Sequence, residues 1–334
     1  MTASERIAGE PVPGLGGRSR WADLDGPVHY LDFGGPAHGP MIIAVHGLGG
    51  SAVNWSAIAP LLTKKYRLIA PDLSGHGLTA SAGRGTDVAA NTALLRRFMA
   101  LVAPGPVILL GNSMGGMISL LAASTGPESV RSLILLDPAL PLQPVRPDPL
   151  VTAVFAVSAV PVLGPLLARH RRLMPVESLV ASTLALCCVD PARVPPDIVA
   201  RHVEVARRRA AMAGDGRDFA HAARSVVETA GLLRGQAYRR SLRAINCPVL
   251  LIHGQRDRLV PVAAARAVVR SHPAWTLVEL PDIGHVPQLE APAETAHAMS
   301  TWLANSGAAG PAAPRTRPVR AARAVRVPAP RKAS

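Results

Sequence analysis

The chain has 334 residues, of which 49% are apolar and 17% charged, so it is long enough for one large domain with a sizeable core. Aromatic residues make up only 3%, which excludes a dense aromatic platform for single-stranded nucleic acid. The formal net charge is +14, but residues 305–334 hold six Arg, one Lys and no acidic residue, and so carry half of it. The rest of the chain is modestly basic, and we expect no specific nucleic-acid partner.

The cysteine pattern and the first residues bear on the compartment. Cys187, Cys188 and Cys247 are odd in number and lack the spacing of a disulfide framework, which favours a reducing environment. Residues 1–30 contain no apolar core of a secretory signal, so we expect a cytoplasmic protein. The uncharged stretch 149–168 has about the length that spans a bilayer, but three prolines and a glycine interrupt it. We interpret it as an apolar part of a cap or lid.

Short apolar runs recur along the chain, and each is followed by a loop with glycine or polar residues. In chain order, the runs are residues 41–45, 67–70, 107–110, 133–136, 249–252 and 276–280. Segments with helical spacing of apolar residues lie between them, as at Leu95, Phe98, Met99 and Val102. This alternation predicts an α/β fold with a mostly parallel central sheet flanked by helices.

The alternation is interrupted in the middle of the chain. It stops at Pro138, where five prolines fall within twelve residues, and resumes near Pro248. Residues 140–240 show helical stretches and no convincing strand, so we predict an inserted helical cap there. The other predicted parts are an N-terminal extension over 1–26, a core formed by 27–139 and 241–304, and a disordered basic tail over 305–334. The tail is a candidate for weak contact with acidic membrane surfaces.

The segment Gly111-Asn112-Ser113-Met114-Gly115 follows an apolar run and precedes a helix-like stretch, which is the context of a G-x-S-x-G nucleophile elbow. Glycines two positions before and after Ser113 remove side chains where a strained turn packs closely. A serine nucleophile needs a histidine base and an acid that orients the base. Asp257 in GQRDRLVP and His285 in PDIGHVPQLE both follow predicted strands, in the order Ser, Asp, His.

With HGLGG at 46–50 and PDLSGHG at 71–77, these motifs make the chain resemble the serine-nucleophile branch of the α/β-hydrolase superfamily over roughly residues 27–303, apart from the cap. The resemblance implies an α/β-hydrolase fold with the catalytic triad Ser113, Asp257 and His285. It also implies that the backbone N–H groups of Leu48 and Met114 form the oxyanion hole. Neither a cofactor nor a metal is expected, because no phosphate-binding glycine motif and no metal-ligand spacing occurs.

Three further side chains have a second interpretation. Asp137, at the end of the preceding core strand, is a substitute candidate for the catalytic acid. His46 is interpreted as a brace of the loop that carries Leu48, and His253 as a core histidine.

The serine at the elbow argues against the branches that use an aspartate nucleophile, such as epoxide hydrolases and haloalkane dehalogenases. We expect hydrolysis of carboxylic esters, with a small-molecule ester or acyl substrate and an apolar acyl group under the cap. The apolar cap stretch has an equally simple explanation, which is that it seals the cap onto the core. The alternatives are a C–C bond hydrolase of ring-cleavage products, whose elbow GNSMGG resembles, and a non-catalytic ligand-binding homologue. Thioesterase, acyltransferase and haloperoxidase-like activities share the triad.

Overall fold

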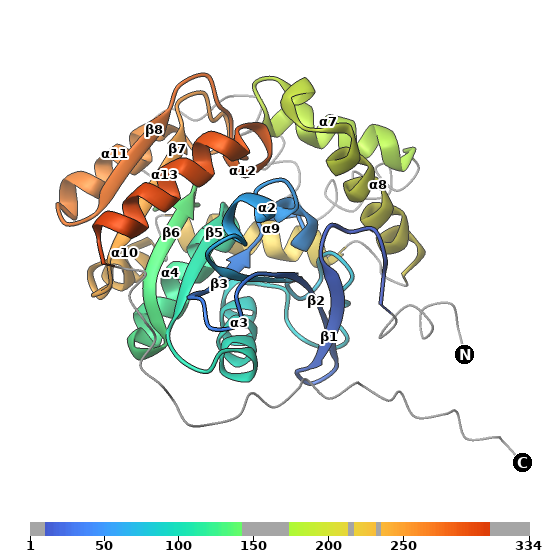
Figure 1. The fold of residues 1–334 in the computed structure, drawn as a ribbon, viewed down its shortest axis with the longest axis horizontal. Helices are drawn as coiled ribbons and strands as arrows, with labels where there is room; N and C mark the ends of the chain where they lie inside the picture. Colours follow the sequence, from blue (N-terminus) through green and yellow to red (C-terminus); the bar gives the residue numbers. More distant parts are fainter. Residues whose placement is uncertain (1–10, 142–173, 213–216, 232–234, 308–334) are drawn as a thin grey trace, which may run out of the picture.

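The computed structural model describes residues 11–141, 174–212, 217–231 and 235–307. Its centre is one sheet of eight strands in the order β1-β2-β4-β3-β5-β6-β7-β8 (Figure 1). The strands are β1 (Arg18–Asp23), β2 (Pro27–Gly34), β3 (Met41–Val45), β4 (Arg67–Pro71), β5 (Val107–Asn112), β6 (Val130–Leu136), β7 (Val249–Gly254) and β8 (Thr276–Leu280). Pairs among β3 to β8 are parallel, whereas β2 runs antiparallel to β1 and β4. The predicted fold class is confirmed.

Strands β3 to β8 coincide with the six apolar runs of the sequence. Every residue of β5 and of β7 is buried, which explains why their sequences are apolar without alternation. The hairpin β1–β2 was not predicted, because polar residues interrupt its apolar ones and leave no continuous run. Since β1 lies inside the predicted N-terminal extension 1–26, the core sheet begins at Arg18 and not at residue 27.

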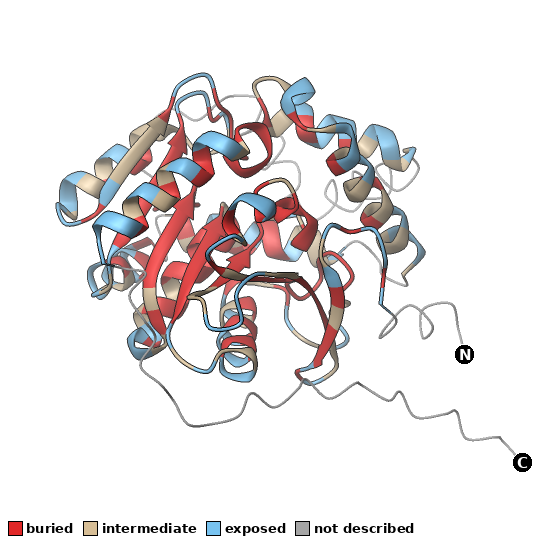
Figure 2. Ribbon diagram, in the orientation of Figure 1, coloured by how far each residue is buried: buried red, intermediate tan, exposed pale blue. Residues whose placement is uncertain are grey.

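Helices cover both faces of the sheet. In the described ranges they are η1 (Ala52–Trp55), α2 (Ala59–Leu62), α3 (Val88–Val102), α4 (Met114–Thr125), η2 (Pro127–Ser129), α7 (Val176–Cys187), η3 (Pro191–Arg193), α8 (Pro196–Ala211), α9 (Arg217–Ala230), α10 (Gly235–Arg243), α11 (Val262–Ser271), α12 (Pro287–Glu290) and α13 (Pro292–Asn305). Helices such as α3 and α13 bury the side that meets the strands and expose the other side (Figure 2).

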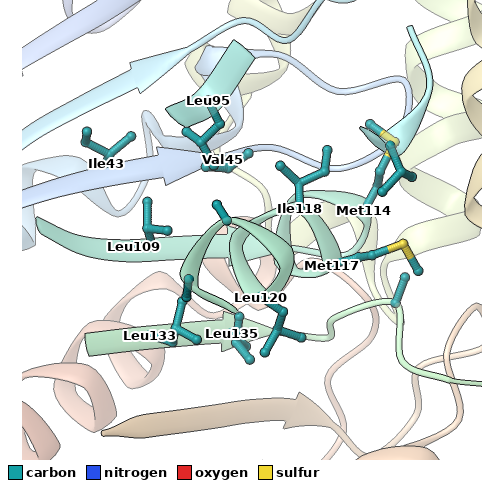
Figure 3. Close-up of a cluster of buried hydrophobic side chains, with 14 of the residues drawn as sticks. Ile43, Val45, Leu95, Leu109, Met114, Met117, Ile118, Leu120, Leu133 and Leu135 are labelled. Atoms are coloured by element: carbon teal, nitrogen blue, oxygen red, sulfur yellow. The ribbon is translucent and has the colours of Figure 1, made fainter. Parts of the chain in front are cut away.

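Alternate residues of the parallel strands pack into two hydrophobic cores, because successive side chains of a strand point to opposite faces. Ile43 and Leu109 belong to the core that α3, α4, α10 and α11 complete. Figure 3 shows side chains of α4, among them Ile118 and Leu120, packed against the strand residues of this core. Ile42 and Ile108 belong to the opposite core, which α2 and α13 complete.

Helices α7, α8, α9 and α10 fall in the segment predicted as a cap, and no strand lies in the described residues between β6 and β7. Helices α7 and α8 share a third apolar cluster that also contains Val286 and Leu289 from the neighbourhood of α12 (Figure 1). Helix α10 packs on α4, and the Tyr238 hydroxyl donates to the Ala139 carbonyl at 2.8 Å. The C-terminal end of the predicted cap therefore contacts the core directly.

Two predicted features lie outside the described residues. They are the apolar stretch 149–168 and, beyond residue 307, the basic tail. Among the helices of the described ranges, none combines the length and the hydropathy needed to cross a bilayer.

Candidate active site

Ser113 lies in the turn between β5 and α4. Its backbone has φ 55° and ψ −120°, a conformation that costs a residue other than glycine on the order of 1–3 kcal/mol. Hydrogen bonds tie the turn to the end of β6 and the residues after it: the Ser113 N–H donates to the Leu136 carbonyl at 3.1 Å, and the Ser113 carbonyl accepts from the Ala139 N–H at 3.0 Å. The residue is partly exposed. The strained strand-to-helix turn that the G-x-S-x-G pattern predicts is therefore present.

Close backbone contacts explain the glycines around Ser113. A Cβ atom on Gly111 would lie 2.5 Å from the carbonyl oxygen of Gly115, and one on Gly115 would overlap the carbonyl oxygen of Val45. A Cβ on Gly47 would lie 3.0 Å from the Cβ of Ser113. The end of β3 and the start of α4 thus pack with no room for side chains, which brings the loop after β3 beside Ser113.

Asp257 and His285 are hydrogen-bonded to each other, with 2.7 Å between Asp257 Oδ2 and His285 Nδ1. Asp257 Oδ1 accepts from the backbone N–H groups of Leu259 at 2.8 Å and Val260 at 3.1 Å. Burial alone would raise the pKa of Asp257, but the charge and hydrogen bond of His285 hold that pKa below its usual value. An ionised Asp257 favours the tautomer with the proton on Nδ1, which leaves Nε2 as the basic nitrogen.

Asn112 links His285 to the elbow. Its side-chain amide donates to the carbonyl groups of His285 and Leu136, both at 3.0 Å. Asn112 directly precedes Ser113, so this contact holds the loop of His285 next to the serine. The loops after β5, β7 and β8 meet because these strands belong to one parallel set whose carboxyl ends share an edge of the sheet. Sequence reasoning quoted Asn112 in the elbow motif but assigned it no role.

A second carboxyl group, Asp137, and a second histidine, His253, lie beside Asp257. Asp137 Oδ1 accepts from the Gly254 N–H at 2.9 Å, and His253 Nε2 lies 3.5 Å from Asp137 and 3.6 Å from Asp257. Burial, together with the charge of Asp257, raises the pKa of Asp137 well above its usual value, whereas burial lowers the pKa of His253. Both shifts favour the neutral form of the group. The contacts favour Asp257 over Asp137 as the partner of His285.

The same three side chains are the group that most resembles a metal site in the described part of the chain. Ligand atoms of Asp137, His253 and Asp257 all lie within 4.8 Å of one another. Both oxygens of Asp257 already accept hydrogen bonds, and a carboxyl group that keeps its proton is a poor metal ligand. The donor set therefore fits a hydrogen-bonded acid cluster better than a bound cation.

Buried polar groups brace the loop that carries Leu48. His46 Nδ1 donates to the Gly47 carbonyl at 2.8 Å, and His46 Nε2 accepts from the Leu73 N–H at 3.1 Å. Burial lowers the pKa of His46, so the ring is neutral and uses both nitrogens, in agreement with the interpretation of His46 as a brace. Asp72, which sequence reasoning missed although PDLSGHG contains it, accepts from the Ala52 N–H at 2.6 Å.

The two predicted oxyanion donors flank the elbow. Among the described residues, the N–H groups of Leu48 and Met114 donate to no other group. Met114 is the first residue of α4, where the backbone N–H has no partner in its own helix. Within the described ranges both amides keep a free N–H, which is what the predicted oxyanion hole requires.

Comparisons with known proteins show the family and the fold of the chain. The family model for the alpha/beta hydrolase fold matches residues 40–292. A pimeloyl-[acyl-carrier protein] methyl ester esterase from Aromatoleum aromaticum is 30% identical over 266 residues, which cover 77% of this chain and 95% of that protein. The structure of Cfl2 from Burkholderia cenocepacia is similar with a TM-score of 0.71 and 25% identity, covering 87% of this chain and 97% of Cfl2. A bacterial membrane phospholipase A is similar with a TM-score of 0.69 and 27% identity, covering 89% and 88%.

Proposed function

Because the chain belongs to the alpha/beta hydrolase fold family, we propose that it is a serine ester hydrolase whose catalytic triad is Ser113, His285 and Asp257. The observation that carries the proposal is the hydrogen bond between Asp257 and His285. Asn112 bonds to the His285 carbonyl and directly precedes Ser113, which is strained and partly exposed. The names of two of the compared proteins, a methyl ester esterase and a phospholipase A, are those of ester hydrolases.

The proposed reaction has two halves. Ser113 Oγ attacks the ester carbonyl carbon and passes its proton to His285 Nε2, while the carbonyl oxygen gains negative charge and is held by the N–H groups of Leu48 and Met114. The ester bond breaks, the alcohol leaves with the proton from His285, and an acyl group stays on Ser113. In the second half, His285 removes a proton from water, and the water oxygen attacks the acyl carbon. The bond from that carbon to Ser113 Oγ then breaks, His285 returns the proton to Ser113 Oγ, and the acid leaves. Asp257 stabilises the charged imidazole ring in both halves.

The test is hydrolysis of p-nitrophenyl esters from acetyl to palmitoyl by the wild type, by Ser113→Ala, and by Ser124→Ala as a matched control on the same helix. Ser124 bonds only within α4, to the Leu121 carbonyl. We expect Ser113→Ala to lower kcat on the order of 10⁴- to 10⁶-fold and Ser124→Ala to leave it unchanged. Retained activity in Ser113→Ala would contradict the proposed nucleophile.

The same series tests the proposed apolar acyl group. Activity that rises with chain length supports it, whereas activity confined to acetyl esters rules it out. If the folded wild-type protein cleaves no ester, C–C bond hydrolysis of a ring-cleavage product becomes the better hypothesis, because GNSMGG resembles the elbow of those enzymes.

A further inference from the structure

The buried carboxylate of Glu290 joins the cap to the loop that carries His285. Its Oε1 accepts from the backbone N–H groups of Val189 and Asp190, both at 2.9 Å, in the connection that follows α7. Its Oε2 accepts from the N–H of Gly284 at 2.8 Å, directly before His285. The side chain of Glu290 has no exposed surface. One carboxylate thus satisfies two amides of the cap and one of the histidine loop, which we define as residues 281–290.

Further contacts join the same two segments. The N–H of His285 itself donates to the Cys187 carbonyl, the last residue of α7, at 2.7 Å. From η3, the Arg193 guanidinium donates to the carbonyl of Asp282 at 2.7 Å and to its carboxylate at 2.6 Å. A Cβ on Gly284 would overlap the Cys187 carbonyl oxygen, so the two backbones touch. The end of α7 and the histidine loop therefore form one packed unit.

These contacts leave His285 held from three sides. Asp257 bonds to the ring, Asn112 bonds to the carbonyl, and Cys187 accepts from the N–H. Of these three contacts, only the one with Cys187 comes from the predicted cap. Glu290 fixes the backbone of both segments that this contact joins, because it accepts from Val189 and Asp190 after α7 and from Gly284 before His285. Hydrogen bonds from N–H groups to a buried carboxylate are about twice as strong as neutral ones. Loss of the carboxylate would leave three donors without their partner, of which the Gly284 N–H is buried and the Val189 and Asp190 N–H groups are part-buried.

We propose that Glu290 is a positioning residue for the catalytic histidine. It fixes the position of the His285 backbone relative to Ser113. Because Glu290 also binds the residues after α7, a movement of the end of α7 would change the geometry of proton transfer between Ser113 and His285. This inference rests on the proposed triad. Because a shift of about 1 Å in a catalytic group can cost on the order of 10²-fold in rate, a loosened Gly284 would reduce proton transfer without removing a reacting atom.

The test compares Glu290→Gln with Glu294→Gln, a matched control with an exposed carboxylate in the first turn of α13. Glutamine keeps the volume and one acceptor oxygen, but its amide group faces at least one N–H donor. We expect Glu290→Gln to lower kcat and the rate at which a fluorophosphonate labels Ser113 by about 10- to 100-fold, with KM changed less than kcat. Glu294→Gln should match the wild type. All rates are measured well below the melting temperature of each variant.

A purely structural role predicts a different result, which is a lower melting temperature with unchanged kcat and labelling rate in the folded fraction. That result would overturn the inference. Arg193→Ala weakens the same link from the cap and should reduce the labelling rate severalfold in the same direction. If Glu290→Gln does not fold, the labelling rate of Ser113 in Arg193→Ala tests the inference instead. A rate equal to that of the wild type would then overturn it.

Failure of the proposed triad gives a separate signature. Labelling that is absent in the wild type, or that persists in Ser113→Ala, contradicts the triad whatever Glu290 does. Labelling that depends on Ser113 but is equal in the wild type and Glu290→Gln contradicts only the role of Glu290.

Discussion

Two buried carboxyl groups that follow neighbouring strands have pKa values shifted in opposite directions, because their partners differ. Asp257 bonds to His285 and to two backbone amides, which stabilise a negative charge. Asp137 has one amide partner and lies beside the charge of Asp257, so its pKa is raised by burial and by that charge. Like charges this close in the interior cannot both persist, and the group with fewer donors keeps its proton.

Asp137→Asn replaces a carboxyl whose raised pKa favours its neutral form with a neutral group of the same shape, so we expect kcat within a few-fold of the wild type. Asp257→Asn should lower kcat on the order of 10³- to 10⁴-fold, because the amide no longer selects the Nδ1–H tautomer. Steady-state kinetics on one ester checks both. If Asp137→Asn proves as damaging as Asp257→Asn, then Asp137, the substitute candidate from the sequence, is needed as an acid.

The raised pKa of Asp137 also leads us to expect that the free energy of unfolding depends on pH. Its folded pKa is raised above the ordinary 3.8, so above that pH the unfolded chain releases a proton that the folded protein retains. Stability is therefore lost as pH rises from about 4 towards the folded pKa. Asp137→Asn lacks this loss, so its stability relative to the wild type should increase over that range. Urea unfolding midpoints between pH 4 and pH 8 measure the difference, and a constant difference would contradict the assignment.

At the scale of elements, the elbow depends on the contact between α4 and β3. Gly115→Ala places a methyl group on the Val45 carbonyl oxygen, whereas Gly105→Ala, before β5, meets nothing within 4 Å. We expect Gly115→Ala to cost about 1–3 kcal/mol of unfolding free energy and to lower kcat, because α4 must move away from β3. Gly105→Ala should change both little. Thermal unfolding and ester kinetics test the pair, and a Gly115→Ala variant as active and stable as Gly105→Ala would contradict this packing.

The hairpin at the edge of the sheet shows where local patterns were insufficient. Strands β1 and β2 are antiparallel neighbours, and the pair nearest the turn is Asp23 with Pro27. Between them, Asp25 and Gly26 have positive φ values of 59° and 109°. An Asp-Gly pair favours a hairpin turn, but here the flanking residues are mixed in polarity and show no regular alternation that would indicate two strands. The six inner strands were predictable because burial on both faces requires uninterrupted apolar residues.

At the scale of the whole molecule, packing affects all three thiols, although only Cys188 is fully buried and Cys187 and Cys247 are partly exposed. Burial raises the pKa of Cys187 to about 12 and that of Cys247 to about 11, and burial also raises the pKa of Cys188. We expect iodoacetamide at pH 8 to leave activity unchanged and to alkylate these residues only in denaturant, because the thiolate is the reactive form. Cys187 touches His285 through its carbonyl, so modification there would register as lost activity. Mass spectrometry beside an activity assay tests this, and rapid inactivation would contradict it.

Local sequence was enough to predict the fold class, the six inner strands, the elbow around Ser113 and the loops that carry Asp257 and His285. Each of these depends on neighbours within one element, where apolar periodicity and glycine positions act directly. The sequence already favoured Asp257 over Asp137 as the partner of His285, but the hydrogen bond between them, the link from Asn112 and the joining of the predicted cap to the core by Glu290 were open to the folded structure alone. Those contacts connect side chains and backbone groups from separate segments, and only the packing of the parallel strands and the cap brings them within hydrogen-bonding distance.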